Sequence, residues 1–582
     1  MSYERALREA LDAALEAGEL LRREFHRWGG PRGHGSHADA DEEAEWLIRK
    51  RLTAAFGYQY RGEETGSVPS EDPHVWLIDP NDGTTSFLRG ARGSAVSIGL
   101  VRSGVPVLGV VYAFAAPDDR GDLIYWAEGF DLARNGAKVG PGPEQNVVLL
   151  SLHREALLES VMDCLAPYRV MAVPSIAYRL ALVAAGEGSA AVSWHGPGDW
   201  DYAAGHALLR AAGSVFVDEN GRDVEYAKDG SSKVRRCFGG KSKVVRDLWR
   251  RNWSQIQQRQ LKPSAAQTSQ FHFARPRPGK AIASAPLLSR AQGCLLGHMA
   301  GQVFGSQTPP TELMPGQTSG GSEMAILLAR SLVSRSKYDR NDVAQSYAHW
   351  FHEDHPLEIP PGVAQALKVL SRPVDAPALV AERSADQRNQ TSGSLVRISP
   401  LAIYGYRKDL DDVWNLACEE SRLTHPHSIC QQSCAVLAVA LAHVIRTGDP
   451  PQAVFATALQ MASLKRADAL LLQSMEEAQI RPPSRSANGE LAIAAVQHAF
   501  YQLLHAQSFE EAITKTTQSA ISGTCSVTGG LLGAVFGRDS IPASWRNSIL
   551  SFRPYSASPQ PRPMPLWPID LLLLSELLLL AG

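Results

Sequence analysis

The sequence predicts a multidomain chain in which an α/β layered domain precedes an all-α domain. The 582 residues exceed the length of one ordinary domain, and 44% of them are hydrophobic, which is enough apolar material for more than one core. Helical and strand-like patterns alternate over roughly the first 250 residues, as is typical of layered α/β domains. From residue 286 onward, Ala/Leu-rich segments at helical spacing dominate, which predicts a nearly all-helical second domain.

The elements of the first domain can be placed in order. Residues 3–25 carry apolar side chains at helical spacing, and residues 41–56 predict a second helix with acids at its start and bases toward its end. Residues 76–114 contain three strand-like runs. Residues 176–192 and 202–212 are alanine-rich and predict two further helices.

A polar, proline-bearing and aperiodic stretch separates the two patterns. We therefore expect a first domain over residues 1–256, a linker over 257–285 and a second domain over 286–582. The C-terminal run LLLLSELLLLAG is too short to span a bilayer, and we expect it to form a buried or docking helix.

The net charge and the cysteine content limit which binding partners and which cellular compartment can be expected. A net charge of −2 provides no general attraction to nucleic acid or anionic membranes, so we expect neither as a partner. Seven cysteines in so long a chain form no disulfide framework and suit a reducing compartment. The sequence therefore predicts a cytoplasmic protein.

Two carboxylates flank a short bend in the stretch WLIDPNDGTTS, residues 76–86. Asp79 ends an apolar strand-like run, and Asp82 is carried round by the bend toward the same place, together with the carbonyl of Asn81. Hard cations such as Mg²⁺ take oxygen ligands of this kind. Residues 83–85 (GTT) can open a helix whose free N–H groups hold an anion. The stretch therefore predicts a metal site beside a phosphate site.

Three separated motifs resemble, in order and spacing, those of the inositol monophosphatase family. They are GEE at 62–64, WLIDPNDGTTSF at 76–87 and WDYAAGHALLRAAGSVFVDENG at 200–221. The resemblance covers about residues 1–250. It implies an αβαβα fold and a Mg²⁺-dependent phosphomonoesterase with two or three ions, in which a metal-activated water attacks a small phosphorylated substrate. It also implies a homodimer, since relatives are often dimers.

The resemblance assigns roles to individual residues of this chain. Metal ligation falls to four carboxylates and one backbone carbonyl: Glu63, Asp79, Asp82, Asp201 and Asn81. Catalysis falls to Glu63 and to the pair that orients the attacking water, Asp41 and Thr84. Phosphate and substrate binding fall to Gly83, Thr84 and Thr85.

The loop SWHGPGD at 193–199 bears on substrate choice. Relatives that act on inositol phosphates tend to carry an acid in this region, whereas this chain has Trp194 and His195. An exposed Trp194 would allow a base to stack and favour a nucleotide-type phosphate, while a Trp194 in the core would not contact substrate. We therefore expect a sugar, inositol or nucleotide-type substrate.

Motifs in the second half resemble the ADP-ribosylglycohydrolase family, in order, at 290–305, 319–333, 392–404, 421–428 and 519–537. Active relatives hold two Mg²⁺ ions with aspartate-rich clusters. The aligned positions here are Ser319, Gly320, Gly321, Ala520, Ser522 and Gly523. None of these residues carries a carboxylate, so a site that requires hard anionic ligands cannot assemble. We expect this domain to be catalytically inactive.

Two other functions remain open on the sequence. Both halves could recognise nucleotide or ADP-ribose ligands without turnover, as a regulatory protein would. An active ADP-ribosyl hydrolase is the third hypothesis, and the residues at 320, 321, 520 and 522 disfavour it. The intact acids of the first half favour the phosphatase.

Overall fold

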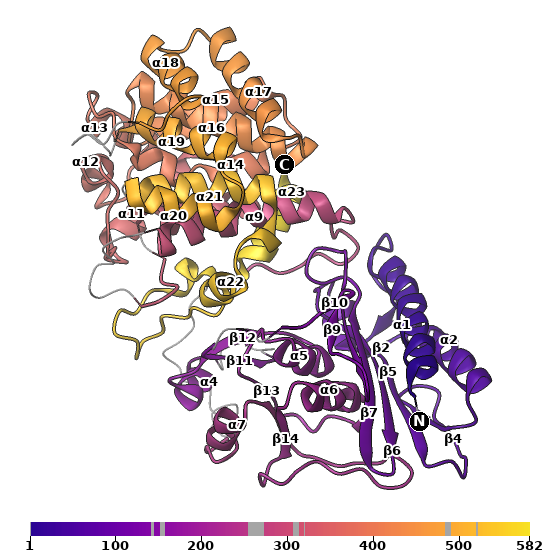
Figure 1. The fold of residues 1–582 in the computed structure, drawn as a ribbon. Coiled ribbons are helices and arrows are strands. Elements are labelled where there is room, and N and C mark those ends of the chain that lie inside the picture. The colour runs from indigo at the N-terminus through magenta and orange to yellow at the C-terminus, as the bar shows by residue number, and fades with distance from the viewer. Residues whose placement is uncertain are drawn as a thin grey trace. The chain divides into compact units, whose positions relative to one another are not determined.

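The chain forms two compact units, residues Met1–Ala283 and Ser284–Gly582 (Figure 1). The computed structural model describes residues 2–140, 142, 145–151, 158–253, 273–305, 314–318, 320–483, 491–519 and 522–582. Within these residues the first unit is α/β and the second is helical, which confirms the predicted fold classes.

Two sheets form the frame of the first unit. The larger has eight strands in the order β10-β9-β8-β7-β6-β5-β3-β4, and the smaller has five in the order β12-β11-β13-β15-β14. The strands of the larger sheet are β3 (Gln59–Gly62), β4 (Ser67–Val68), β5 (His74–Asp82), β6 (Ala95–Arg102), β7 (Val105–Ala113), β8 (Asp122–Ala127), β9 (Ala133–Arg134) and β10 (Ala137–Lys138). Those of the smaller sheet are β11 (Val147–Leu150), β12 (Arg169–Ala172), β13 (Ala190–Ser193), β14 (Val215–Asp218) and β15 (Cys237–Gly240). A separate hairpin pairs β1 (Gly33–His34) with β2 (His37–Ala38).

Helices cover both sheets and complete five layers. The helices are α1 (Glu4–Phe25), α2 (Asp39–Ala55), the short α3 (Thr84–Leu88), α4 (Leu158–Leu165), α5 (Ile176–Ala184), α6 (Asp199–Ala211) and α7 (Ser242–Trp249). Helices α1 and α2 share a core with the larger sheet, α5 and α6 lie in the core between the sheets, and α4 and α7 share a core with the smaller sheet. Alternation along β11 explains this, since Val147 and Leu149 face one core and Val148 and Leu150 the other. The order is the αβαβα arrangement that the resemblance implies.

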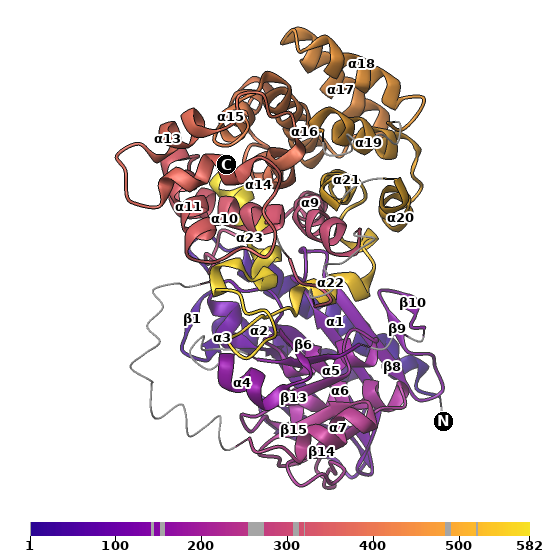
Figure 2. The ribbon, with the colours of Figure 1, turned by 90° about the vertical axis from the view of Figure 1, so that its left-hand side faces the viewer.

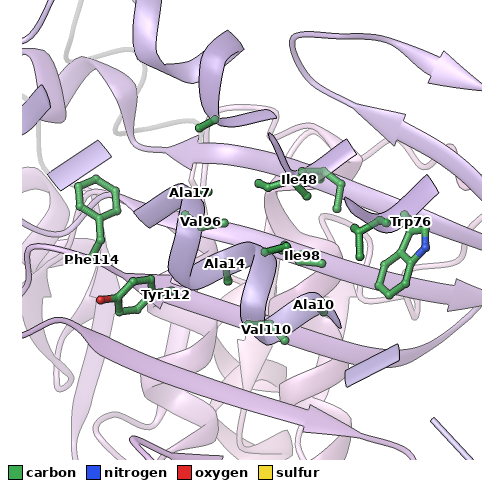
Figure 3. Close-up of a cluster of buried hydrophobic side chains, with 14 of the residues drawn as sticks. Ala10, Ala14, Ala17, Ile48, Trp76, Val96, Ile98, Val110, Tyr112 and Phe114 are labelled. Atoms are coloured by element: carbon green, nitrogen blue, oxygen red, sulfur yellow. The ribbon is translucent and has the colours of Figure 1, made fainter. Parts of the chain in front are cut away.

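Small residues let α1 lie close to the larger sheet. Ala10, Ala14 and Ala17 recur three or four residues apart on one face of the helix, and each has an exposed fraction of 0%. Figure 3 shows this face against Ile98 of β6 and Val110 of β7. The close contact fixes α1 against β6, which pairs directly with β5.

The second unit is built from helices. They are α9 (Ala285–Phe304), α10 (Gly320–Arg335), α11 (Arg340–His352), α12 (Val363–Leu367), α13 (Pro377–Ser384), α14 (Ser399–Tyr404), α15 (Leu410–Arg422), α16 (Ser428–Thr447), α17 (Pro451–Leu464), α18 (Ala469–Ala478), α19 (Ala492–His505), α20 (Phe509–Ser519), α21 (Ser522–Phe536), α22 (Ala543–Leu550) and α23 (Leu571–Ala581). In the described part of the unit, the β-type pairing is one isolated bridge between Thr391 and Leu491.

Glycines bring α9 and α21 into direct backbone contact (Figure 2). A Cβ atom at Gly297 would overlap the carbonyl oxygen of Gly529, and one at Gly533 would overlap that of Gly293. The glycines lie four residues apart on each helix, so they share one helix face. The glycines of this contact between α9 and α21 lie within two of the motifs that resemble the second family, at 290–305 and 519–537.

Two apolar helices of the second unit are buried. Helix α16 is long and apolar enough to cross a membrane, but 78% of its most apolar window is buried inside the unit, as in the core helix of a globular fold. Helix α23 buries Leu571, Leu574 and Leu577, which confirms the expected docking helix at the C-terminus.

Candidate metal centre and active site

Three carboxylates from three elements converge in the first unit. Glu63, Asp79 and Asp201 each offer an oxygen, and these oxygens all lie within 4.8 Å of one another. Glu63 directly follows β3, Asp79 lies in β5, and Asp201 lies in the first turn of α6. Strands β3 and β5 are parallel, so their carboxyl ends meet at one edge of the sheet and place Glu63 beside Asp79.

A break in the register of β5 shapes the bend. The pairing of β5 with β6 shifts between Asp79 and Asp82, and the Asn81 N–H donates to Asp79 Oδ1 at 2.8 Å. Such an irregularity turns a strand locally and re-aims its side chains. The DPND bend therefore places Asp79 toward Glu63 while Asp82 takes a different set of partners.

Asp82, the last residue of β5, directs its carboxylate to the start of α5 and is not one of the three clustered acids. The Ser175 hydroxyl and the Ala177 N–H donate to its Oδ2 at 2.5 and 2.7 Å. Burial raises the pKa of Asp82, and these two bonds and the charge of Arg179 offset part of the rise. Its own charge still raises the pKa of Asp79, so it belongs to the same electrostatic site.

Burial and nearby carboxylates raise the pKa values of the three clustered acids. Burial is the largest cause for Asp79, and the charges of Glu63, Asp82 and Asp201 add to it, so its pKa lies well above the usual range. Removal from water and the neighbouring acids raise the pKa of Glu63 to about 7, although part of its side chain is exposed. Ionised carboxylates this close together repel one another. A divalent cation bound between them would offset this repulsion, and carboxylate oxygens are ligands that such a cation prefers.

Asp41, Asn81 and Thr84 form a hydrogen-bonded group beside this cluster. The Thr84 hydroxyl lies 2.9 Å from Asp41 Oδ2 and 3.0 Å from the Asn81 carbonyl oxygen, and the Asn81 amide donates to Asp41 Oδ1 at 2.8 Å. Asp41 is 1% exposed, and burial raises its pKa to about 6 although both bonds oppose the rise. The hydroxyl has one proton, so when it donates to Asp41 its oxygen is free to accept from water.

The residues expected to bind substrate fall into two groups. Gly83, with φ +101°, precedes the five-residue helix α3, and Thr84 and Thr85 form its first turn. Trp194 is only 8% exposed and packs in the core of the smaller sheet, with its ring centroid 6.1 Å from that of Trp253. The structure thus gives Trp194 the core role that the sequence left open, and base stacking on it has no support.

Several supporting residues escaped the sequence analysis. Glu45 is fully buried in α2 and accepts from the N–H groups of Glu64 and Thr65 at 2.7 and 2.9 Å, which fixes the loop after Glu63. Ser175 caps α5 and binds Asp82. The only signals were one more acid in an acid-rich helix and a serine before a helix, which occur widely without function.

Among the aligned positions of the second unit, Gly320 lies beside a carboxylate, because a Cβ atom there would be 3.3 Å from Glu358 Oε2. Gly320 and Gly321 begin α10, and the 3-10 turn Ser392–Arg397 crosses beside them. A Cβ atom at Gly321 would overlap the side chain of Val396, and one at Gly523 would lie 3.2 Å from Val396 Cγ1. Ser319 and Ala520 lie outside the described residues, and Ser522 is described only as part of α21.

Glu323, the acid nearest to Gly320 and Gly321 in the sequence, already has partners. Glu323 is 0% exposed, and Arg562 donates to both of its carboxylate oxygens at 2.7 Å each. The Trp350 indole N–H donates to it as well, at 2.7 Å. A bidentate arginine and an indole satisfy this carboxylate within the fold, which is the arrangement of a structural ion pair.

Comparisons with known proteins agree with this division. Residues 3–255 match the inositol monophosphatase family, and residues 283–557 match the ADP-ribosylglycohydrolase family. Inositol-1-monophosphatase of Mesorhizobium japonicum is 34% identical over 251 residues, which cover 38% of this chain and 88% of that protein. Inositol monophosphatase 1 of Solanum lycopersicum is 30% identical over 246 residues, which cover 38% of this chain and 88% of that protein.

A solved structure titled "ADP-ribosylglycohydrolase-related protein complex" aligns with a TM-score of 0.42 and 21% identity, over 51% of this chain and 99% of that chain. The site geometry and the sequence matches lead to one assignment. The chain belongs to the inositol monophosphatase family through residues 3–255, and it carries an ADP-ribosylglycohydrolase domain over residues 283–557.

Proposed function

We propose that the first unit is a Mg²⁺-dependent phosphomonoesterase acting on a small phosphorylated sugar, inositol or nucleotide-type substrate. The observation that carries the proposal is the convergence of Glu63, Asp79 and Asp201 within 4.8 Å. Membership of the family implies phosphomonoesterase-type activity, and the acids required for it are present.

Five groups would hold the metal ions. They are the carboxylates of Glu63, Asp79, Asp82 and Asp201 and the backbone carbonyl of Asn81. A divalent cation bound there supplies Lewis-acid activation of the phosphate and of a water molecule. The five groups come from the residue after β3, from the end of β5 and from the first turn of α6, and this frame of strands and a helix limits their movement.

Asp41 and Thr84 would orient the attacking water. Ionised Asp41 accepts a hydrogen bond from the Thr84 hydroxyl, so the Thr84 oxygen would accept a hydrogen bond from water and turn a lone pair of the water toward the phosphorus. The buried Asn81 amide holds the other oxygen of Asp41 and fixes the direction of this chain of bonds. Positioning of this kind supplies a large share of the rate in phosphoryl transfer.

Asp79→Asn tests the proposal. The substitution keeps the shape of the side chain and removes one anionic ligand, and it should lower Mg²⁺-dependent phosphate release more than about 100-fold, since loss of an outer-shell partner alone costs 10–100-fold. The assay uses inositol phosphates, sugar phosphates, 3′-phosphoadenosine 5′-phosphate and ADP-ribose phosphates, each with and without Mg²⁺. Asp131→Asn is the matched control, because Asp131 pairs with Lys138 on the surface. Equal rates for the two variants would refute the proposed site.

We further propose that the second unit does not hydrolyse ADP-ribosyl bonds by a metal mechanism. The support is that Val396 occupies the space beside both Gly321 and Gly523, and that Glu323 is bound by Arg562. The full chain should therefore leave ADP-ribosylated peptides intact at Mg²⁺ concentrations that saturate the phosphatase. Release of ADP-ribose that persists in Asp79→Asn would overturn this part.

A further inference from the structure

Residues 277–282 (RPGKAI), which we call the docking segment, lie outside both family matches, because these end at residue 255 and begin at residue 283. The sequence pattern indicates a linker here, but the segment packs on the first unit. Ala281 contacts the hydrophobic core that α1 and α2 share with the larger sheet. The side chain of Ile282 is 8% exposed.

Two glycines make room for Pro278. Gly30, in the loop after α1, has φ +96°, and a Cβ atom there would lie 2.9 Å from Pro278 Cβ. Gly90, just beyond α3, has φ +75°, and a Cβ atom there would lie 2.9 Å from Pro278 Cα. From the other side, a Cβ atom at Gly279 would lie 2.5 Å from the carbonyl oxygen of Arg27. These contacts are closer than any side chain allows, so the docking segment meets the first unit backbone against backbone.

An arginine fixes the end of the docking segment. Arg92 Nη2 donates to the Ile282 carbonyl at 2.8 Å, and Nη1 donates to the Ala115 carbonyl and to Asp119 at 2.6 and 2.9 Å. The guanidinium also lies over the Phe25 ring, 5.5 Å from its centroid. Because the arginine is held at three other points, its bond to Ile282 gives the segment a rigid anchor.

Pro278 contacts two segments, at Gly30 and at Gly90, and each of them leads directly to Asp41 or to Thr84. The loop that contains Gly30 continues through β1 and β2 into α2, which carries Asp41. Gly90 follows α3, whose first residue is Thr84. The docking segment therefore braces both segments whose relative position sets the 2.9 Å contact between Asp41 and Thr84.

We propose that the docking segment is a positioning element of the phosphatase, which holds Asp41 and Thr84 in register by wedging Pro278 between the loop at Gly30 and the end of α3. This inference rests on the proposed function. Misplacement of reacting groups by about 1 Å can cost 100-fold in rate. The segment that leads to the second unit thus helps to position two residues of the active site in the first unit.

Neighbouring glycines provide a matched test in the full chain. Gly30→Ala and Gly279→Ala should each displace the docking segment. Gly30 lies in the loop after α1 and Gly279 in the docking segment, so the two variants alter the same contact from its two sides. Gly29→Ala is the control, because Gly29 has a similar φ of +87° and nothing within 4 Å of its Cβ position. The readouts are amide hydrogen exchange over residues 26–38 and 84–91, kcat and KM for phosphate release, and Mg²⁺ affinity.

We expect faster exchange in both ranges for Gly30→Ala and Gly279→Ala, together with a 10- to 100-fold loss in kcat. Mg²⁺ affinity should stay within about twofold, since no metal ligand moves, and Gly29→Ala should match the wild type. The double variant should lose no more than one single variant, because both break the same contact.

Two results would overturn the inference: faster exchange with kcat equal to that of Gly29→Ala, or unchanged exchange in both test variants. If the wild type releases no phosphate from any substrate, the proposed function and the positioning role fail together. The exchange data would in that case still decide whether the segment docks.

Discussion

At the scale of single residues, the site depends on a few short contacts among buried polar groups. Asp41 is buried at 1% exposure, and its two hydrogen-bond partners come from the DPND bend and from the first residue of α3. A buried carboxylate without partners would be costly, so these bonds stabilise it and fix its direction at once. The same contacts that stabilise Asp41 define where a water molecule can bind.

Thr84→Val tests this contact. Valine keeps the shape of threonine but removes the hydroxyl, so the attacking water loses its acceptor and Asp41 loses a donor. We expect kcat for phosphate release to fall about 100-fold or more, as for removal of a positioned acid–base partner, with Mg²⁺ affinity unchanged. Thr84→Ser retains the hydroxyl and should retain most of the rate. A Thr84→Val enzyme as fast as Thr84→Ser would remove the hydroxyl from the mechanism.

The sequence was most informative at this residue scale, and only for residues within motifs. Asp79, Asp82 and Asp201 are readable because their neighbours form long, ordered patterns. Glu45 and Ser175 are not, because their contacts with the loop after Glu63 and with Asp82 depend on chain segments that meet only in the fold. Trp194 had two readings, and only the packing against Trp253 separates them.

At the scale of elements, close approach of backbones determines which pieces pack together. Helices α9 and α21 touch through glycines, and the docking segment meets Gly30 and Gly90. Glycine in a helix costs about 1 kcal/mol relative to alanine, so its repeated use in one face indicates a contact that excludes side chains. The sequence shows the glycines of α9 and α21, but a run of proline, glycine and lysine at 277–280 indicates a flexible connection and conceals the docking.

Two adjacent glycines of α21 test the helix contact. A Cβ atom at Gly529 would overlap the Gly297 carbonyl, whereas one at Gly530 would lie at an ordinary 3.6 Å from His298 Cβ. Gly529→Ala should destabilise the second unit by about 1–3 kcal/mol, because the helices must separate. Gly530→Ala should be neutral or slightly stabilising through its better helix propensity. Denaturant-dependent hydrogen exchange of α9 and α21 measures both, and equal effects would show that the contact is not tight.

At the scale of the whole molecule, the chain joins an α/β unit that carries a crowded acid site to a helical unit in which Val396 packs beside Gly321 and Gly523. The fold class of each unit follows from periodicity, because strand-like and helical spacing differ clearly along the sequence. The packing of Val396 beside Gly321 and Gly523 could not be predicted, since Val396 lies far from both in sequence. The sequence shows only which residue types stand at 320, 321 and 523, whereas the structure shows which side chains pack beside them.

The most direct measurement is calorimetric titration of the full chain with Mg²⁺, for the wild type, the double variant Asp79→Asn/Asp201→Asn and the control Asp131→Asn. The account predicts saturable binding to the wild type and the control, and none to the double variant, with its secondary structure intact by circular dichroism. That result would assign the metal binding of the chain to the first unit. Binding that survives in the double variant, or fails in the wild type, would contradict the central claim that the clustered carboxylates form the chain's metal centre.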